Sequence, residues 1–245
     1  MIDTEEKKSK NLIKDSQNFM KKTNNSMERY ERKWVFDNID YNQLSILLYR
    51  SKLFFSTQFP DREVNSIYFD DQNYSAIKQN FEGVSNKKKY RLRWYGNLNK
   101  ITNSVFEVKK KKGFVVKKEH FFLKKLNNLN LLNYDHLNKI EKFINDNFNF
   151  KNKLSPVLTT HYLRSYFISS NDLVRATIDV NLKSLPLYRN SNISIIKEFK
   201  ETILEIKYDT NLDIYVRNNL KQISSRLSKN SKFVNSATIN AFSYM

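Results

Sequence analysis

The sequence contains no cysteine, which excludes disulfide bonds and thiolate metal sites and fits a reducing compartment. It has only three glycines and three prolines, and no stretch of linker composition or internal repeat divides it, so a single domain is predicted. No apolar run approaches the length of about 18 residues that a membrane-spanning helix needs, and the polar N-terminus lacks the apolar segment of a secretory signal. These absences predict a soluble protein of the cytoplasm with no transmembrane segment.

Positive charge, in contrast, is in large excess. The 43 lysines and arginines face 25 acidic residues, a formal net charge of +18. Such a balance favours polyanionic partners: nucleic acid, polyphosphate, nucleotides or anionic lipid. The chain is also rich in Asn, Lys and Ile, as a protein from an AT-rich genome would be, so part of the lysine can be spread over a solvated surface. The positions of the cations must therefore distinguish the two interpretations.

Residues 1–27 are polar and show no periodicity, and we expect them to form a loosely ordered arm before a domain at residues 28–245. Helical spacing of apolar residues occurs in residues 41–54, where Asp40 is the expected N-cap, and again in residues 132–148 and 211–227. Segments rich in β-branched and aromatic residues predict eight strands. These are residues 29–36, 64–70, 88–95, 104–111, 114–122, 157–168, 174–182 and 201–209. The predicted fold class is α+β, with eight mostly antiparallel strands that close into a barrel or curl strongly.

Alternate residues of a strand share a face, and this rule separates charge from apolar residues in the predicted strands. In KKKYRLRWYG, residues 87–96, Arg91 and Arg93 share one face while Leu92 and Trp94 share the other. An ordinary antiparallel sheet with one dry and one solvated face would give a similar division. Here, however, ordered charged pairs recur from strand to strand, which favours charged faces turned into a closed barrel that binds a polyanion. The other pairs are Glu31 with Lys33, Glu107 with Lys109, Arg175 with Asp179, and Glu205 with Lys207.

A set of short motifs, in this order, resembles the VTC (vacuolar transporter chaperone) domain, a family within the CYTH-like triphosphate tunnel metalloenzymes. The motifs are YERKWVF, VNSIYFDDQNY, RLRWYG, FEVKKKKGFVVKK, THYLRSYF, VRATIDVNL, ILEIKYD and SKNSKF, which together span Glu28 to Phe233. The resemblance implies an eight-stranded antiparallel barrel with flanking helices, the triphosphate tunnel. It also implies a polyphosphate polymerase that transfers the γ-phosphate of ATP to a growing polyphosphate chain with Mn²⁺ or Mg²⁺.

The resemblance also implies roles for individual residues. Glu205 is similar to the metal-binding glutamate, while Glu31 and Glu107 are secondary candidates because either could orient cations instead. Parity allows only one of Lys117 and Lys118 to face inward, and the motif alignment selects Lys117. Catalytic and phosphate-binding roles are implied for Lys33, Arg91, Arg93, Lys109, Lys117, Arg164 and Arg175, with Lys229, Ser231 and Lys232 as further substrate contacts at the tunnel mouth.

Elementary chemistry agrees with these roles, because guanidinium groups bind phosphate oxygens in bidentate fashion and lysines add point charges. For Arg91 and Arg93 the alternative is a solvated strand face, and for Glu205 it is a cross-strand salt bridge to a lysine.

At the level of function, a metal-dependent triphosphatase or nucleoside triphosphatase and a non-catalytic polyphosphate- or nucleotide-binding module remain alternatives. Arg29 stands where triphosphatase relatives carry a glutamate, which argues for transfer or binding over efficient hydrolysis. Nucleic-acid binding is disfavoured, because aromatic and cationic residues take opposite strand faces. Export of polyphosphate would require a separate membrane partner.

Overall fold

A computed structural model of the chain describes residues 22–25, 29–112, 115–187, 196–223, 226–228 and 231–241. These residues divide into two compact units. The first unit comprises residues 22–25 and 66–157, and the second comprises residues 29–65 and 158–241. Two long antiparallel strands, β3 (Ser56–Asp70) and β7 (Ser155–Ile168), contribute residues to both units.

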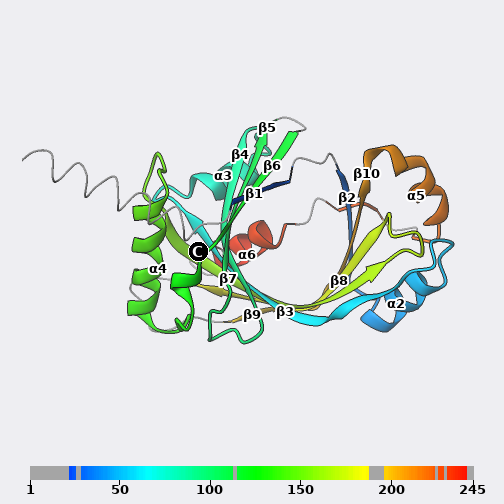
Figure 1. The fold of residues 1–245 in the computed structure, drawn as a ribbon, viewed down its shortest axis with the longest axis horizontal. Coiled ribbons are helices and arrows are strands. Elements are labelled where there is room, and N and C mark those ends of the chain that lie inside the picture. The colour runs from blue at the N-terminus through cyan, green and yellow to red at the C-terminus, as the bar shows by residue number, and fades with distance from the viewer. Residues whose placement is uncertain are drawn as a thin grey trace, which may run out of the picture. The chain divides into compact units, whose positions relative to one another are not determined.

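The first unit is built on an antiparallel sheet in which β4, β5 and β6 lie side by side (Figure 1). The order of its strands is β1 (Lys22–Asn25), β6 (Val115–Phe122), β5 (Val105–Lys112), β4 (Lys87–Tyr95) and the C-terminal part of β3. The helices of this unit are α3 (Ser75–Phe81), the short 3-10 helix η1 (Lys124–Leu126) and α4 (Tyr134–Asn147). Strand β1 lies within the segment that we expected to be a loosely ordered arm, and it pairs with the edge of β6.

The apolar face of this sheet packs against aromatic residues that follow α4. Leu92, Trp94 and Phe106 are fully buried. The chain leaving α4 returns to the sheet, so that the ring of Phe148 lies 4.8 Å from the ring centroids of both Phe106 and Phe121. The alternation in β4 and β5 thus places the large apolar side chains in the core and the charged ones on the opposite face.

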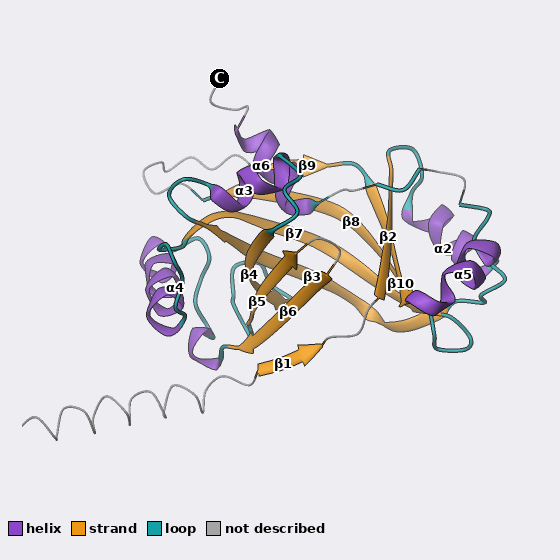
Figure 2. Cartoon of the chain, turned by 90° about the horizontal axis from the view of Figure 1, so that it is seen from above, coloured by secondary structure: helices purple, strands orange, loops and turns teal. Residues whose placement is uncertain are grey.

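The second unit has a five-stranded antiparallel sheet whose apolar face is covered by α2 and α5 (Figures 1 and 2). Its strand order is the N-terminal part of β3, then β7, β8 (Arg175–Pro186), β10 (Thr202–Asp209) and β2 (Arg29–Phe36), with the short β9 (Lys197–Phe199) paired to β8. Its helices are α2 (Tyr41–Tyr49), η2 (Thr210–Leu212), α5 (Asp213–Asn219) and α6 (Lys232–Ala241). Trp34, Ile178 and Leu204 of the sheet pack with Leu44 of α2 and Val216 of α5.

The predicted fold class, α+β with eight antiparallel strands and flanking helices, is confirmed. The eight predicted strands correspond to β2 through β8 and β10. Strand β3 begins at Ser56, earlier than the predicted start at residue 64. The prediction missed this part of the strand because proline is unusual within strands and charged residues follow Pro60. Asp40 caps α2 as predicted, with a reciprocal capping box to Gln43. None of the described helices is both long and apolar enough to span a bilayer.

Two α-helices were not predicted, and two predicted helices are shorter than expected. Helix α3 has only seven residues, too few for a periodic pattern to be recognised. Helix α6 contains Val, Asn, Ser, Thr and Ile, which have weak intrinsic helix preference. The third predicted helix, residues 211–227, forms only through Asn219, and α2 likewise ends at Tyr49 instead of Phe54.

Candidate phosphate-binding site

One face of the first unit's sheet concentrates positive charge. The register of three neighbouring strands places Arg91 opposite Glu107, Lys109 opposite Lys118, and Glu107 opposite His120. Residues directly opposite each other in a sheet share a face, so these side chains lie on the side away from the aromatic core. We call this set the basic face of the first unit. It consists of Lys89, Arg91, Arg93, Glu107, Lys109, Lys118 and His120.

Glu107 holds the two arginines of this face in place. Its Oε2 accepts from Arg91 Nε at 2.9 Å and from Arg91 Nη2, while its Oε1 lies 2.7 Å from Arg93 Nη2. Burial would raise the pKa of Glu107, but the two guanidinium groups outweigh it and lower that pKa to about 2. Both carboxylate oxygens are therefore occupied by arginines at neutral pH, which favours an orienting role for Glu107 over metal binding.

The choice of Lys117 for this face is wrong. The pairing of β5 with β6 places Lys118 opposite Lys109, whereas Lys117 lies opposite Lys110 on the reverse face. There the ammonium groups of Lys110 and Lys117 lie 2.9 and 4.0 Å from Glu119, and the Lys117 side chain is 59% exposed. A shift of one residue in register would exchange the two lysines, and a single-sequence motif comparison does not determine register.

In the second unit, charged residues gather on the sheet face opposite the core of Trp34 and Leu204. The register aligns Lys33 with Glu205 and then with Thr177, from β2 across β10 to β8. The neighbouring row aligns Glu31, Lys207 and Arg175. We call this set the charged face of the second unit. Its members are Glu31, Lys33, Arg164, Arg175, Asp179, Glu205 and Lys207.

Glu205, the predicted metal ligand, lies buried between two lysines. Lys33 Nζ is 3.4 Å from its Oε2, and Lys207 Nζ contacts its Oε1. Burial would raise the pKa of Glu205, but Lys207, Lys33 and the more distant Arg164 lower it well below its usual range. Glu31, the second carboxylate of this face, lies 4.0 Å from Lys33 Nζ. The cross-strand salt bridge that we considered as the alternative is therefore present in this structure.

The described residues contain no group of three or more His, Asp or Glu side chains that could hold a metal ion by themselves. Glu31 and Glu205 flank the same lysine, so this face can offer one or two carboxylates to a cation. That donor set fits Mg²⁺ or Mn²⁺ when phosphate oxygens and water complete the coordination, as is usual for these ions in phosphate sites.

Asp179 is not among the site residues predicted from the sequence, which left it open as a second carboxylate or as a partner of Arg175. In the structure its carboxylate accepts from Arg164 at 2.6 and 2.7 Å and from Lys232 Nζ at 2.5 Å. Burial would raise the pKa of Asp179, and the two cations lower it instead. The ring of Tyr162 lies 5.3 Å from the Arg164 guanidinium and 4.5 Å from Lys232 Nζ. This buried pairing ties the first residue of α6 to β8.

The remaining predicted residues occupy more peripheral places. Arg175 is exposed, opposite Lys207 at the end of its row. Ser231 caps α6, since its hydroxyl and carbonyl oxygens accept from the backbone N–H groups of Val234 and Asn235. Lys229 lies outside the described residues.

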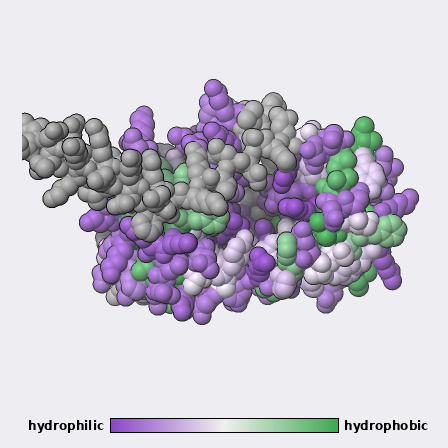
Figure 3. All heavy atoms as spheres, in the orientation of Figure 1, coloured by the Kyte–Doolittle hydropathy of each residue, from purple (hydrophilic) through white to green (hydrophobic). Residues whose placement is uncertain are grey.

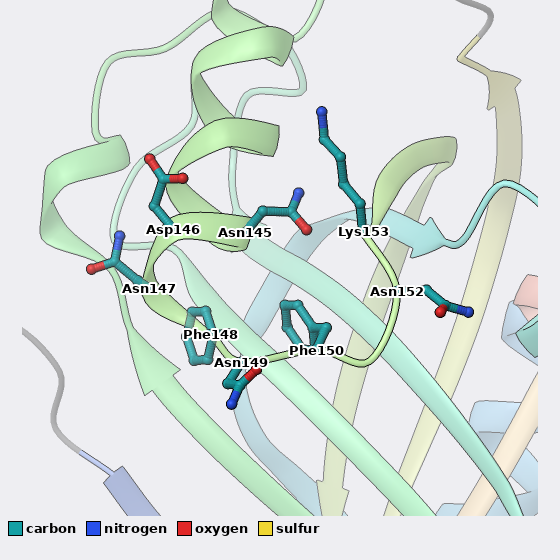
Figure 4. A pocket seen from close by; sticks show the side chains of 8 residues that line it. All are labelled: Asn145, Asp146, Asn147, Phe148, Asn149, Phe150, Asn152 and Lys153. Atoms are coloured by element: carbon teal, nitrogen blue, oxygen red, sulfur yellow. The ribbon is translucent and has the colours of Figure 1, made fainter.

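A separate cavity of about 570 Å³ lies at the end of α4, and it contains no predicted site residue (Figure 4). Its wall is the chain from Asn145 to Lys153, in which Asn145 is hydrogen-bonded to both the N–H and the carbonyl of Leu154. These bonds explain Asn145 as a support of the loop. Elsewhere, hydrophilic residues dominate the described surface in the view of Figure 3, as the excess of lysine leads one to expect.

Three solved structures resemble the chain at low sequence identity. A putative adenylate cyclase from Vibrio parahaemolyticus is 11% identical, with a TM-score of 0.47 over 86% of this chain and 99% of that one. A putative adenylyl cyclase from Hippeastrum, HpAC1, described as having a dominant triphosphatase activity, is 12% identical, with a TM-score of 0.48 over 86% and 96%. A putative adenylate cyclase from Bacillus halodurans is 13% identical, with a TM-score of 0.44 over 84% and 96%.

No curated protein matches the sequence. The VTC domain family, in contrast, matches residues 28–240, nearly the whole length. The chain therefore belongs to the VTC domain family, which indicates a function in the chemistry of triphosphates or polyphosphate.

Proposed function

We propose that the protein is a polyphosphate polymerase that transfers the γ-phosphate of ATP to a growing polyphosphate chain with the help of a divalent cation. The observation that carries the proposal is the pair of carboxylates that hold cations in fixed positions. Glu107 holds Arg91 and Arg93, and Asp179 holds Arg164 and Lys232. All four cations are among those that resemble the family's phosphate-binding residues.

Fixed cations suit phosphoryl transfer for a physical reason. The reaction needs little covalent chemistry from the protein, and depends on positioning and on neutralising charge that develops in the transition state. A guanidinium already oriented by a buried carboxylate needs little reorganisation when phosphate oxygens bind to its remaining N–H groups. In this proposal Lys33, Lys109 and Arg175 add further phosphate contacts, and Ser231 and Lys229 contribute beside Lys232.

The proposed metal site is Glu205, with Glu31 as its second carboxylate. A bound Mn²⁺ or Mg²⁺ would neutralise phosphate oxygens during transfer. Lys33 and Lys207, which contact Glu205 in this structure, would be displaced toward phosphate oxygens when the carboxylate binds the cation. The lysines would then hold the reacting phosphate beside the metal.

Incubation of the purified protein with ATP and either Mn²⁺ or Mg²⁺ tests the activity. We expect long-chain polyphosphate to accumulate with release of one ADP for each phosphate added. Arg91→Ala should abolish most of this product without unfolding the protein. Absence of chain growth from folded protein with several divalent metals would contradict the proposal.

The alternative activity is metal-dependent hydrolysis of triphosphate or of nucleoside triphosphates, and two carboxylates near each other on the charged face favour it. Release of inorganic phosphate without chain growth in the same assay would select it. Binding of polyphosphate with no turnover would select a binding module. A cytoplasmic location and a separate membrane partner for export stay predictions.

A further inference from the structure

An aromatic cluster lies on the second unit beside the charged face. Phe59 of β3 is 44% exposed, and its ring meets that of Tyr166 of β7 edge-on, with centroids 5.9 Å apart. The guanidinium of Arg62 lies 5.3 Å from the Phe59 ring centroid and 5.6 Å from that of Tyr166. Two aromatic rings and one planar cation thus form a single cluster, which we call the aromatic platform.

The platform continues a row of the charged face. Tyr166 is opposite Thr177, which is opposite Glu205, which in turn is opposite Lys33. Neighbouring strands are about 4.8 Å apart, so the backbone of Tyr166 lies about 10 Å across the sheet from that of Glu205. The row therefore changes from aromatic to hydroxyl to carboxylate to lysine within four strands.

Thr177 provides a second observation between the platform and the charges. Its hydroxyl oxygen is buried and has no hydrogen-bond partner within the described part of the chain. Buried hydroxyl groups are nearly always hydrogen-bonded, so an unpaired one calls for an explanation. Rotation of the Thr177 side chain about χ1 would bring this hydroxyl to a sugar hydroxyl of a nucleotide that spans the platform and Glu205.

Phosphate binding alone gives no reason for aromatic residues at this place. Rings and guanidinium planes do, however, bind nucleobases by stacking, because every base has a π face. We propose that Phe59, Arg62 and Tyr166 bind the base of a nucleoside triphosphate whose phosphates lie on the charged face of the second unit. The inference rests on the proposed function, since it takes the charged face as the phosphate site, and it names the residues that distinguish a nucleotide from inorganic triphosphate.

Calorimetric titration with two probes tests the platform: the non-hydrolysable imido analogue of ATP, and inorganic tripolyphosphate. Tyr166→Ala should weaken binding of the nucleotide about tenfold, within the range known for one base stacked on one aromatic ring. Binding of tripolyphosphate should stay within about twofold, because it lacks a base. Tyr166→Phe, which keeps the ring, should bind both probes like the wild type.

Tyr215→Ala is a matched control, because Tyr215 is 42% exposed on α5, away from the charged face. It should bind both probes normally. Phe59→Ala, in the exposed half of β3, provides a second test if Tyr166→Ala lowers the yield of folded protein. It should show the same selective loss of nucleotide binding.

The outcomes separate the platform from the proposed function. If wild type binds both probes and the platform variants leave nucleotide binding unchanged, or weaken both probes equally, the base site is wrong while phosphate binding stands. If wild type binds neither probe, phosphate binding on the charged face is wrong and the base site is overturned with it. Loss of nucleotide binding with unchanged tripolyphosphate binding supports the base site, and the polymerase activity is tested separately by the ATP assay.

Discussion

The two charged faces of the molecule differ in how many carboxylates accompany their cations. Of the residues that define the basic face of the first unit, five are cations and one is a carboxylate, Glu107, which pairs with two arginines. Of the residues that define the charged face of the second unit, four are cations and three are carboxylates, Glu31, Asp179 and Glu205. Both faces belong to antiparallel strands in which charged residues alternate with apolar ones. The difference in carboxylate content therefore comes from the residue types and not from the fold.

This difference suggests a division of work. A face with a large excess of cations attracts a polyanion of any length, since its field depends on net charge. A face in which carboxylates alternate with cations has a weaker net field, but can place a metal ion and a phosphate at defined positions. We therefore expect the first unit to determine affinity for the phosphate chain, and the second to determine turnover.

The largest effect is expected from Asp179→Asn in the second unit. The change removes the charge that neutralises two buried cations, and breaking a buried ion pair costs about 3–5 kcal/mol. The free energy of unfolding, measured with urea, should fall by this order. Lys117→Ala is the control, since that side chain is mostly exposed and should change stability little. Similar stability of the two variants would show that Asp179 does not support Arg164 and Lys232.

Glu205→Ala should separate turnover from binding. If Glu205 holds the metal, turnover should fall on the order of a hundredfold or more, as when an electrostatic group of an active site is removed. Polyphosphate binding should survive, because the variant leaves Lys33 and Lys207 in place. Unchanged turnover in the assay with Mn²⁺ would show that the metal assignment is wrong, and would remove the proposed division of work.

Acid should weaken the first unit through Glu107. Its pKa falls from 4.5 to about 2 on folding. Because the folded-state pKa is depressed, the contribution to stability is complete above about pH 4.5 and is lost as pH falls toward 2. At 1.36 kcal/mol per pKa unit, the contribution is about 3 kcal/mol.

Urea unfolding of wild type and Glu107→Gln at pH 6 and pH 3 measures this contribution. The free energy of unfolding of wild type should fall more steeply with acid than that of the variant. Parallel pH profiles would mean that the two arginines do not hold Glu107 ionised.

The smallest effect compares two adjacent lysines of β6. Lys118→Ala should weaken polyphosphate binding by up to about 1 kcal/mol, the usual scale for a partly solvated charge pair, and the loss should diminish at high salt. Lys117→Ala should bind normally, because Lys117 lies on the reverse face. Fluorescence titration with polyphosphate at two salt concentrations measures both. The opposite order of effects would contradict the observed register.

The sequence predicts some parts of the site well and others poorly. The division of Arg91 and Arg93 from Leu92 and Trp94 follows from the two-residue period of a strand, and the structure confirms it. The two-residue period does not specify which residues these side chains contact. Glu107 forms ion pairs with both arginines because β4 pairs with β5 in this register. Alternation within one strand does not specify that register.

Asp179 illustrates the same limit over a longer distance. Its parity placed it on a face with Arg175, but its partners Arg164 and Lys232 come from β7 and α6. Helix α6 was not predicted at all, since its residues have weak helix preference and it is stabilised by packing and by the Asp179 contact.

The sequence by itself determined eight of the strands and which residues of one strand share a face. These properties depend on periods of two residues and on composition, and both are local. Only the tertiary structure decided which strands are neighbours and in which register. That information selects Lys118 over Lys117, gives Asp179 its partners, and brings Phe59 and Arg62 against Tyr166, about a hundred residues further along the chain. Contacts between residues so far apart arise from packing the whole sheet, so no local pattern can specify them.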